Sequence, residues 1–187
     1  MAKEYGKGKT MELQIRKADE KDLDQVEQLY HALNDYLARP EVENGPRWSR
    51  DVYPLREHAA EGLEAGELYV AENRGQIVGT VIYLSRQGEE YQQVDWQLPY
   101  EVPAVVIHVL AVHPDYMGCG IGAALLDHAA AVGRERGARA IRLDTYEKNH
   151  AAIRLYEKCG FSCRGLLDLG LEEIYGLKWY KVFEKVL

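Results

Sequence analysis

Three glycines stand at alternate positions, Gly118, Gly120 and Gly122, between an apolar run and an amphipathic stretch. Glycine has no Cβ, so its backbone can approach an anion closely. The first N–H groups of a helix have no partner within the helix, and the helix dipole favours negative charge near them. The segment Met117-Gly118-Cys119-Gly120-Ile121-Gly122 is therefore predicted either to cradle a pyrophosphate or to form a tight strand-to-helix turn without a ligand.

Two other phosphate-binding patterns are excluded by the spacing of these glycines. The segment has no GxxxxGKS/T with its lysine, and its glycines do not follow GxGxxG. A dinucleotide-binding unit also carries an acidic residue about 20 residues further on. Asp144 stands near that place, so the glycine spacing alone argues against a nicotinamide dinucleotide.

The segment resembles the acyl-CoA signature of the GNAT N-acetyltransferase superfamily, in which Gln or Arg precedes two variable residues, Gly, one variable residue, and Gly or Ala. The run Leu110-Ala111-Val112-His113-Pro114 is similar to the strand and turn that lead into this signature. Downstream, Asn149-x-x-Ala152-x-x-Leu155-Tyr156-x-x-x-Gly160-Phe161 is similar to the family's second motif, at the family's usual separation. The two motifs together are far more specific than either alone.

The resemblance extends from about Leu13 to the C-terminus. Within the family, the chain most resembles a bacterial subgroup of unassigned substrate, through the pairs Tyr53-Pro54, Asp95-Trp96 and Glu184-Lys185. One departure is Met117, which stands where the family usually has Gln or Arg. A polar contact to the pyrophosphate is therefore expected to be missing, which weakens cofactor binding at worst.

The resemblance implies that an acetyl group moves from acetyl-CoA to a primary amine. Such a reaction must hold the thioester, polarise its carbonyl, deprotonate the amine and protonate the leaving thiolate. By resemblance, Tyr156 is the general acid close to the CoA sulfur, and a phenol with a reference pKa near 10 stays protonated at neutral pH. The alternatives are that Tyr156 only packs its helix and that Asn149 only caps it. Outside the glycine-rich segment, the resemblance places the cofactor against Leu110, Ala111, Val112, Asn149 and Ala152.

The general base is open on sequence alone. His108 lies in an apolar strand, on the predicted face of Leu110 and Val112, where an ionisable group is unusual. As a neutral imidazole it can take a proton from the amine, directly or through water, or it is a core histidine with its hydrogen bonds satisfied. Asp144, at the end of the next strand, can instead bind the amine as a cation.

The acceptor pocket is predicted from aromatic residues and carboxylates. Trp48, Tyr53 and Trp96 are expected to line it, because aromatic rings suit an amine-bearing organic substrate, although plain packing also explains them. Asp95 and Glu101 are further carboxylates that can reach the site from an unassigned loop. The histidines and cysteines lack metal-site spacing, so no metal is predicted.

The elements that must position these residues follow from hydrophobic periodicity and breakers. Residues 85–102 are not assigned, and residues 104–112 are predicted to form a central strand buried on both faces. The other expected elements are strand 13–17, a helix capped by Asp19 that ends before Pro40, helix 54–65, hairpin strands 68–72 and 77–84, helix 118–137, strand 140–143, helix 149–158, and strands 162–169 and 174–184. This order predicts a mixed α/β chain. The GNAT resemblance implies a mostly antiparallel, twisted sheet of about seven strands, splayed in the middle and flanked by about four helices.

Length and composition bound the rest. The chain of 187 residues is expected to be one domain, residues 11–187, after a flexible tail, residues 1–10. A net charge of -7 argues against nucleic acid as a partner, and no apolar run is long enough for a membrane span. We expect a cytoplasmic protein with a small-molecule or peptide amine as substrate and a homodimer as one possible assembly. A non-catalytic acyl-CoA sensor of the same fold is the alternative function, and a nucleotide-binding α/β protein of another class is disfavoured by both motifs.

Overall fold

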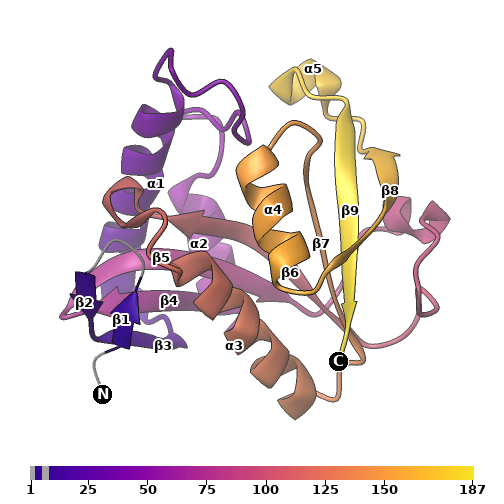
Figure 1. Cartoon of the computed structure of the whole chain (residues 1–187), viewed down its shortest axis with the longest axis horizontal. Coiled ribbons are helices and arrows are strands. Elements are labelled where there is room, and N and C mark those ends of the chain that lie inside the picture. Colours follow the sequence, from indigo (N-terminus) through magenta and orange to yellow (C-terminus); the bar gives the residue numbers. More distant parts are fainter. Residues whose placement is uncertain (1–2, 6–8) are drawn as a thin grey trace.

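The computed structural model describes residues 3–5 and 9–187, with side chains from Met11 onward. Within these residues the chain forms nine strands and five α-helices (Figure 1). The strands are β1 Lys3–Tyr5, β2 Lys9–Met11, β3 Leu13–Lys17, β4 Leu68–Asn73, β5 Gln76–Leu84, β6 Ala104–Val112, β7 Ala140–Tyr146, β8 Ser162–Asp168 and β9 Trp179–Val186. The helices are α1 Leu23–Leu37, α2 Arg56–Glu64, α3 Ile121–Glu135, α4 His150–Lys158 and α5 Glu172–Tyr175.

Seven of the strands form one sheet in the order β3-β4-β5-β6-β7-β9-β8. Every neighbouring pair in it is antiparallel except β6 and β7, which run parallel. α1 and α2 cover one face, and α3 and α4 cover the other (Figure 1). Each helix does so through an apolar stripe at helical spacing, such as Val26, Leu29 and Leu33 on α1. The predicted mixed, mostly antiparallel fold is confirmed.

The sheet opens in its middle. β6 and β7 pair only from Ala104 to Val106 on β6, so the rest of β6 has no strand on that side. β6 also bulges, because the register with β5 shifts between Thr80 and Ile82 and Val109 adopts a positive φ of 46°. Such a φ is an outlier for a β-branched residue and stores strain, which is common at functional sites. The opening and the bulge leave a stretch of β6 backbone beside the space between the two strands.

The bulge corrects two predictions about β6. The strand is buried on both faces only in its first half, since Leu110 and Val112 are partly exposed where the sheet opens. His108 does not share their face. Leu110 and Val112 pack on the α3 side, whereas the His108 ring meets Tyr53 on the α1 side. The extra residue in the strand reverses the alternation of side chains, which no periodicity argument anticipates.

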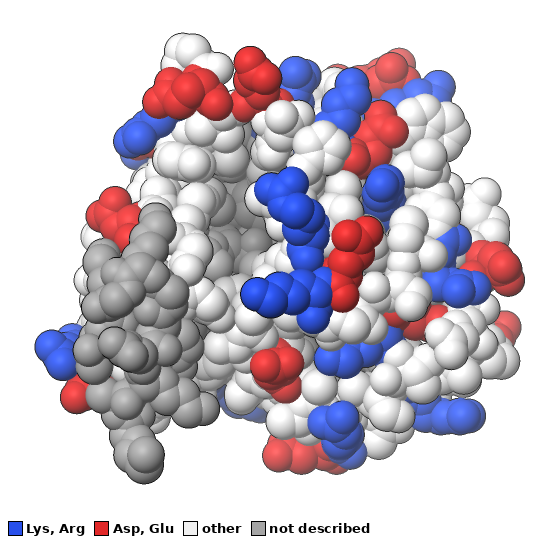
Figure 2. All heavy atoms as spheres, in the orientation of Figure 1, with Lys and Arg blue, Asp and Glu red and all other residues white. Residues whose placement is uncertain are grey.

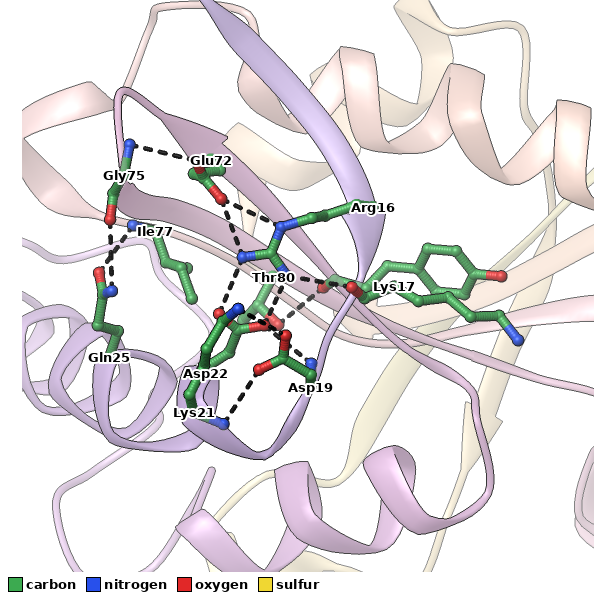
Figure 3. A network of polar contacts seen from close by, with 11 residues as sticks. Arg16, Lys17, Asp19, Lys21, Asp22, Gln25, Glu72, Gly75, Ile77 and Thr80 are labelled. Atoms are coloured by element: carbon green, nitrogen blue, oxygen red, sulfur yellow. Dashed lines mark hydrogen bonds and ion pairs between the residues drawn. The ribbon is translucent and has the colours of Figure 1, made fainter.

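A polar network holds β3, at the edge of the seven-stranded sheet, against the start of α1 (Figure 3). Arg16 on β3 donates to the buried Asp22 carboxylate at 2.6 Å and to Glu72 on β4 at 2.9 Å. The Arg16 guanidinium is the main reason that the pKa of Asp22 lies below its ordinary value. Asp19 caps the short helical turn before α1, as its position predicted.

A second network fastens the long connection between β5 and β6 to the sheet. Arg142 on β7 donates to Glu184 on β9 at 3.0 Å and to the backbone carbonyls of Leu98, Pro99 and Tyr100. The other oxygen of Glu184 accepts from the backbone N–H of Gln97 at 2.6 Å. This connection was not assigned from sequence because its anchors lie on strands far along the chain.

The other predicted elements are confirmed apart from one. Residues 174–184 do not form a single strand, since α5 occupies residues 172–175 and β9 begins at Trp179. Gly170 and Gly176, both with positive φ, interrupt the regular backbone conformation on either side of α5. The predicted flexible tail includes residues 1–2 and 6–8, which lie outside the described residues, and the described parts of it belong to the ribbon of β1 and β2. Among the described residues, no helix is long and apolar enough to cross a membrane.

Candidate functional site

A cavity of about 1260 Å³ lies where β6 and β7 part. Figure 2 shows this face of the molecule hollowed between the α1 side and α4. The cavity runs from the N-terminus of α3, past the open edge of β6 and one face of α4, to the segment between α1 and α2 and the segment around α5. It therefore brings the two predicted motifs to one place, together with residues that neither motif contains.

The glycine-rich segment forms one end of the cavity. Gly118 and Gly120 have φ of 77° and 81°, and Gly120 is the N-cap of α3. The N–H of Ala124 donates to the carbonyl of Gly120, so the preceding N–H groups, from Ile121 to Ala123, have no partner four residues earlier. These residues line the cavity. The geometry suits a phosphate at the helix N-terminus.

Cys119 does not take the position that the sequence suggested. Its N–H donates to the carbonyl of Tyr116, and its side chain is fully buried in the core. The predicted cradle therefore begins after Cys119. Gly122 has a packing role as well, since a Cβ there would lie 2.8 Å from Leu155 on α4. The glycine thus allows α3 and α4 to approach each other.

The open edge of β6 forms the adjoining wall. Leu110 and Val112 line the cavity, while the side chain of Ala111 is buried on the opposite face. The contribution of Ala111 can only be its backbone. Unpaired strand edges bind extended chains through backbone hydrogen bonds. A linear amide arm such as pantetheine fits this edge.

The second motif places α4 along the cavity. Asn149 caps the helix, since its side chain accepts from the N–H of Ala152 at 3.4 Å and donates to Thr145 at 2.9 Å. Asn149 and Ala152 both line the cavity. Tyr156, on the same helix, is 7% exposed and packs against Phe161 and Phe183, with its exposed part in the cavity. Burial, and then the charge of Asp144, raise the pKa of Tyr156, which keeps the phenol protonated at neutral pH.

Asp144 and His108, the two candidate bases, also line the cavity. Asp144 accepts a hydrogen bond from Tyr91 at 2.8 Å, and burial raises the pKa of its carboxyl, with a smaller contribution from Glu90. The His108 ring nitrogen Nε2 lies 3.3 Å from the Tyr53 hydroxyl. Burial, and then the neighbouring His58, lower the pKa of His108 to about 4, so its imidazole is neutral at pH 7.

The structure separates the predicted acceptor residues. Trp48 and Tyr53 line the cavity, with their rings 5.4 Å apart. Trp96 is not a lining residue. It packs under the Arg142 guanidinium at 4.5 Å and donates to the Tyr91 carbonyl, so it supports the loop that carries Tyr91. The carboxylates of Asp95 and Glu101 belong to exposed residues outside the cavity.

Six lining tyrosines did not figure as site residues in the sequence analysis, among them Tyr36, Tyr116 and Tyr146. The other three come from the unassigned connection, from α5 and from β9, and are Tyr91, Tyr175 and Tyr180. Each stands in an aromatic-rich stretch, which was the available signal. Nothing local indicates that these stretches meet at one cavity. Trp179, next to Tyr180, is 40% exposed, whereas Val182 and Phe183 pack internally.

A seven-stranded sheet that opens between two parallel strands, with a glycine-rich helix start at the opening, is the arrangement that the GNAT resemblance implied. A model of the acetyltransferase (GNAT) family matches residues 26–161, and the chain belongs to this family. The expected family is thus confirmed. GNAT enzymes use acetyl-CoA, which agrees with the predicted cofactor.

Curated relatives carry several names. A mycothiol acetyltransferase of Propionibacterium freudenreichii subsp. shermanii is 31% identical over 143 residues, which are 75% of this chain and 40% of that protein. An Escherichia coli ribosomal protein bS18-alanine N-acetyltransferase is 35% identical over 92 residues, 43% of this chain and 61% of that protein. The chain thus matches less than two thirds of the length of either relative.

Solved structures share the fold. A GNAT family acetyltransferase from Listeria monocytogenes superimposes over 100% of both chains with a TM-score of 0.70 at 19% identity. The yncA protein of Salmonella typhimurium, solved with its cofactor acetyl-CoA, covers 94% of each chain with a TM-score of 0.66 at 20% identity. At these identities the likeness concerns the fold alone.

Proposed function

We propose that this protein transfers the acetyl group of acetyl-CoA directly to a primary amine. The observation that carries the proposal is one continuous cavity that joins the free N–H groups of α3, the open edge of β6, Tyr156 and Asp144. The residues present fit acetyl-CoA. The N–H groups of residues 121–123 would hold the pyrophosphate, the β6 edge would hold the pantetheine arm, and Tyr156 would lie beside the thioester.

The proposed step balances in atoms and protons. The neutral amine nitrogen attacks the thioester carbonyl carbon, so a C–N bond forms and the C–S bond breaks. Before the attack, a base in the cavity takes one proton from the bound ammonium. After the attack, the leaving thiolate takes the phenolic proton of Tyr156, and the attacking nitrogen loses a second proton, which solvent passes back to Tyr156. The products are the N-acetyl amine, CoA and the one proton that the base then releases.

Asp144 and His108 are the two candidate bases predicted from the sequence, and both line the cavity. A base with a higher pKa takes a proton from an ammonium more readily. Burial shifts the pKa values of the two groups in opposite directions. It lowers the pKa of His108 to about 4 and raises the pKa of Asp144 above its ordinary value. The Tyr91 hydrogen bond moderates the shift at Asp144. We therefore assign the proton transfer to Asp144, and His108 remains the alternative through its neutral ring.

Cofactor binding tests the proposal first. Acetyl-CoA should raise the melting temperature of the purified protein, while NAD and ATP at equal concentration should not, because a ligand that binds only the folded state stabilises it. Gly120→Glu and Ala123→Glu should each abolish the shift in melting temperature. Both residues line the cavity at the N-terminus of α3, where the new negative charge would repel the pyrophosphate. Ala123→Glu serves where Gly120→Glu fails to fold, because Gly120 has a positive φ and Ala123 does not.

Ala131→Glu is the matched control, because it adds the same charge to an exposed position of the same helix. The acetyl-CoA shift should survive in this variant. A shift that persists in Ala123→Glu would contradict the proposed cradle. Acetyl-CoA binding without thiol release for any amine would instead favour a non-catalytic sensor. The homodimer and the cytoplasmic location stay predictions.

A further inference from the structure

The acceptor end of the cavity contains a carboxylate without a counter-ion among the described residues. Asp144 is exposed only in part, to the cavity, and Tyr91 donates to one of its oxygens. The charged group that acts on it is Glu90, which carries the same sign. A desolvated anion is costly unless a cation pairs with it. The group that would complete this site is therefore a cation brought by the ligand.

The walls around this carboxylate are aromatic. Tyr53 lies at their centre, with ring centroids 5.4 Å from Trp48 and 5.8 Å from Tyr175, both in edge-to-face geometry. Burial, and then the charge of Asp144, raise the pKa of Tyr53 and of Tyr180, so the carboxylate lies within electrostatic reach of both. Aromatic rings bind planar apolar groups and cations alike.

The same rings close the acceptor end. Tyr53 belongs to the segment between α1 and α2, and Tyr175 belongs to α5; both line the cavity. Figure 1 shows α5 at the same end of the molecule as the segment that follows α1. The contact between the two rings joins the two walls. An extended peptide lying across the sheet would have to separate the two tyrosines, whereas a small amine can lie beneath them.

Cations are placed elsewhere along the described lining. Lys158 and Lys185 stand at the far end of α4, where Lys185 donates to the carbonyl of Cys159. Arg47 lines the cavity and also a second pocket, whose lining comes from residues 37–47. It is not among the groups that shift the pKa of Asp144. A carboxylate attached beside the reacting amine would therefore face Asp144 and Glu90 without a compensating cation.

We propose that the acceptor is a small arylalkyl amine that bears no carboxylate beside its amine. Its ammonium pairs with Asp144 and gives up its proton there, and its ring lies against Tyr53 and Trp48. The proposal rests on the acetyl transfer described above and specifies the substrate class of that site. It excludes free α-amino acids and extended peptides as preferred acceptors.

A matched set of amines tests the substrate class on the full chain. The probes are 2-phenylethylamine, L-phenylalanine, which adds only a carboxylate, and a tetrapeptide with an N-terminal alanine. Binding is measured by calorimetry with and without CoA, and turnover by thiol release from acetyl-CoA. We expect 2-phenylethylamine to bind with a Kd at least about tenfold lower than that of either competitor, and to react with a correspondingly higher kcat/KM. Equal or tighter binding of L-phenylalanine or of the peptide overturns the proposal, as does the absence of 2-phenylethylamine binding.

Variants in α5 test the aromatic wall. Tyr175→Ala should raise the Kd for 2-phenylethylamine about three- to tenfold, the effect of one lost aromatic contact, and leave the acetyl-CoA thermal shift unchanged. Ile174→Ala on the same helix is the control, because Ile174 is 64% exposed and does not line the cavity. Equal affinities in the two variants would remove Tyr175 from the site.

The two proposals fail in different ways. If acetyl-CoA shifts the melting temperature and the peptide is acetylated in preference, the acetyl transfer stands and the arylalkyl amine class is wrong. If acetyl-CoA gives no shift while 2-phenylethylamine still binds selectively, the acetyl transfer is wrong and the acceptor site stands. The calorimetric measurement therefore decides the substrate class without depending on turnover.

Discussion

Replacing Arg142 with Met should destabilise the protein far more than the loss of a surface ion pair. The Arg142 side chain is 1% exposed and donates to Glu184 and to the carbonyls of residues 98–100, all within about 3.0 Å. Methionine has a similar length but donates no hydrogen bond. The substitution therefore leaves three carbonyls without this donor and Glu184, itself 0% exposed, as a buried anion without its cation.

The size of the effect follows from the buried charge. Removing one partner of a buried ion pair costs about 3–5 kcal/mol, because the remaining charge is uncompensated. For a chain of this size each kcal/mol lowers the melting temperature by about 2–4 °C, so we expect a decrease of about 6–20 °C. Urea unfolding followed by circular dichroism measures the free energy directly, and a thermal scan checks it.

Two further variants make the test specific. Arg164→Met removes two hydrogen bonds to the exposed backbone carbonyl of Asp95 and a 3.8 Å ion pair with its carboxylate. The Asp95 side chain is 99% exposed, so the loss should stay within about 1 kcal/mol. Arg142→Met combined with Glu184→Met removes the orphaned charge and should recover part of the stability lost in the single variant. A loss below about 1 kcal/mol in Arg142→Met, or a double variant as unstable as the sum of both single variants, would refute the reasoning.

Three other changes have defined outcomes. Tyr156→Phe should lower kcat about 10²- to 10⁴-fold and leave the acetyl-CoA Kd unchanged by calorimetry, and an unaltered rate would remove its assigned role. In a pH profile of kcat/KM, activity should fall as the pH drops through the raised pKa of Asp144, because only the ionised carboxylate accepts a proton. Asp144→Asn should abolish this acidic limb of the profile. An acidic limb that persists in the variant would favour His108 as the base. The pKa of Asp22 is lowered in the folded state, so its stabilisation is present above its unfolded pKa and is lost as pH falls below about 4. Arg16→Met should reduce the difference in unfolding free energy between pH 7 and pH 3, measured with urea, and an unchanged difference would show that Arg16 does not set this pKa.

The sequence alone was informative wherever the signal is local. Asn149 caps α4 and Asp19 caps the turn before α1, because a cap depends on residues within one helical turn. The glycine-rich segment opens α3 at the cavity for the same reason, since its conformation follows from glycines at neighbouring positions. Apolar periodicity likewise predicted most helices and strands, and the two motifs together indicated the family.

The tertiary structure decided what depends on contacts between distant segments. The bulge at Val109 turned His108 to the other face of β6, which depends on the register with β5. Tyr91 reaches Asp144 only because Arg142 and Glu184 fasten its loop to the sheet, and Trp96 belongs to that support instead of to the cavity.

The acceptor end of the cavity shows most clearly the difference between local signals and contacts between distant segments. Tyr53 and Tyr175 stand more than a hundred residues apart and meet because the sheet opens between β6 and β7. Periodicity shows which residues an element buries, but it contains no information on where two strands part or which loops then face each other. For this protein, the sequence determined the parts of the cofactor site, and only the folded chain determined the shape and charge of the acceptor site.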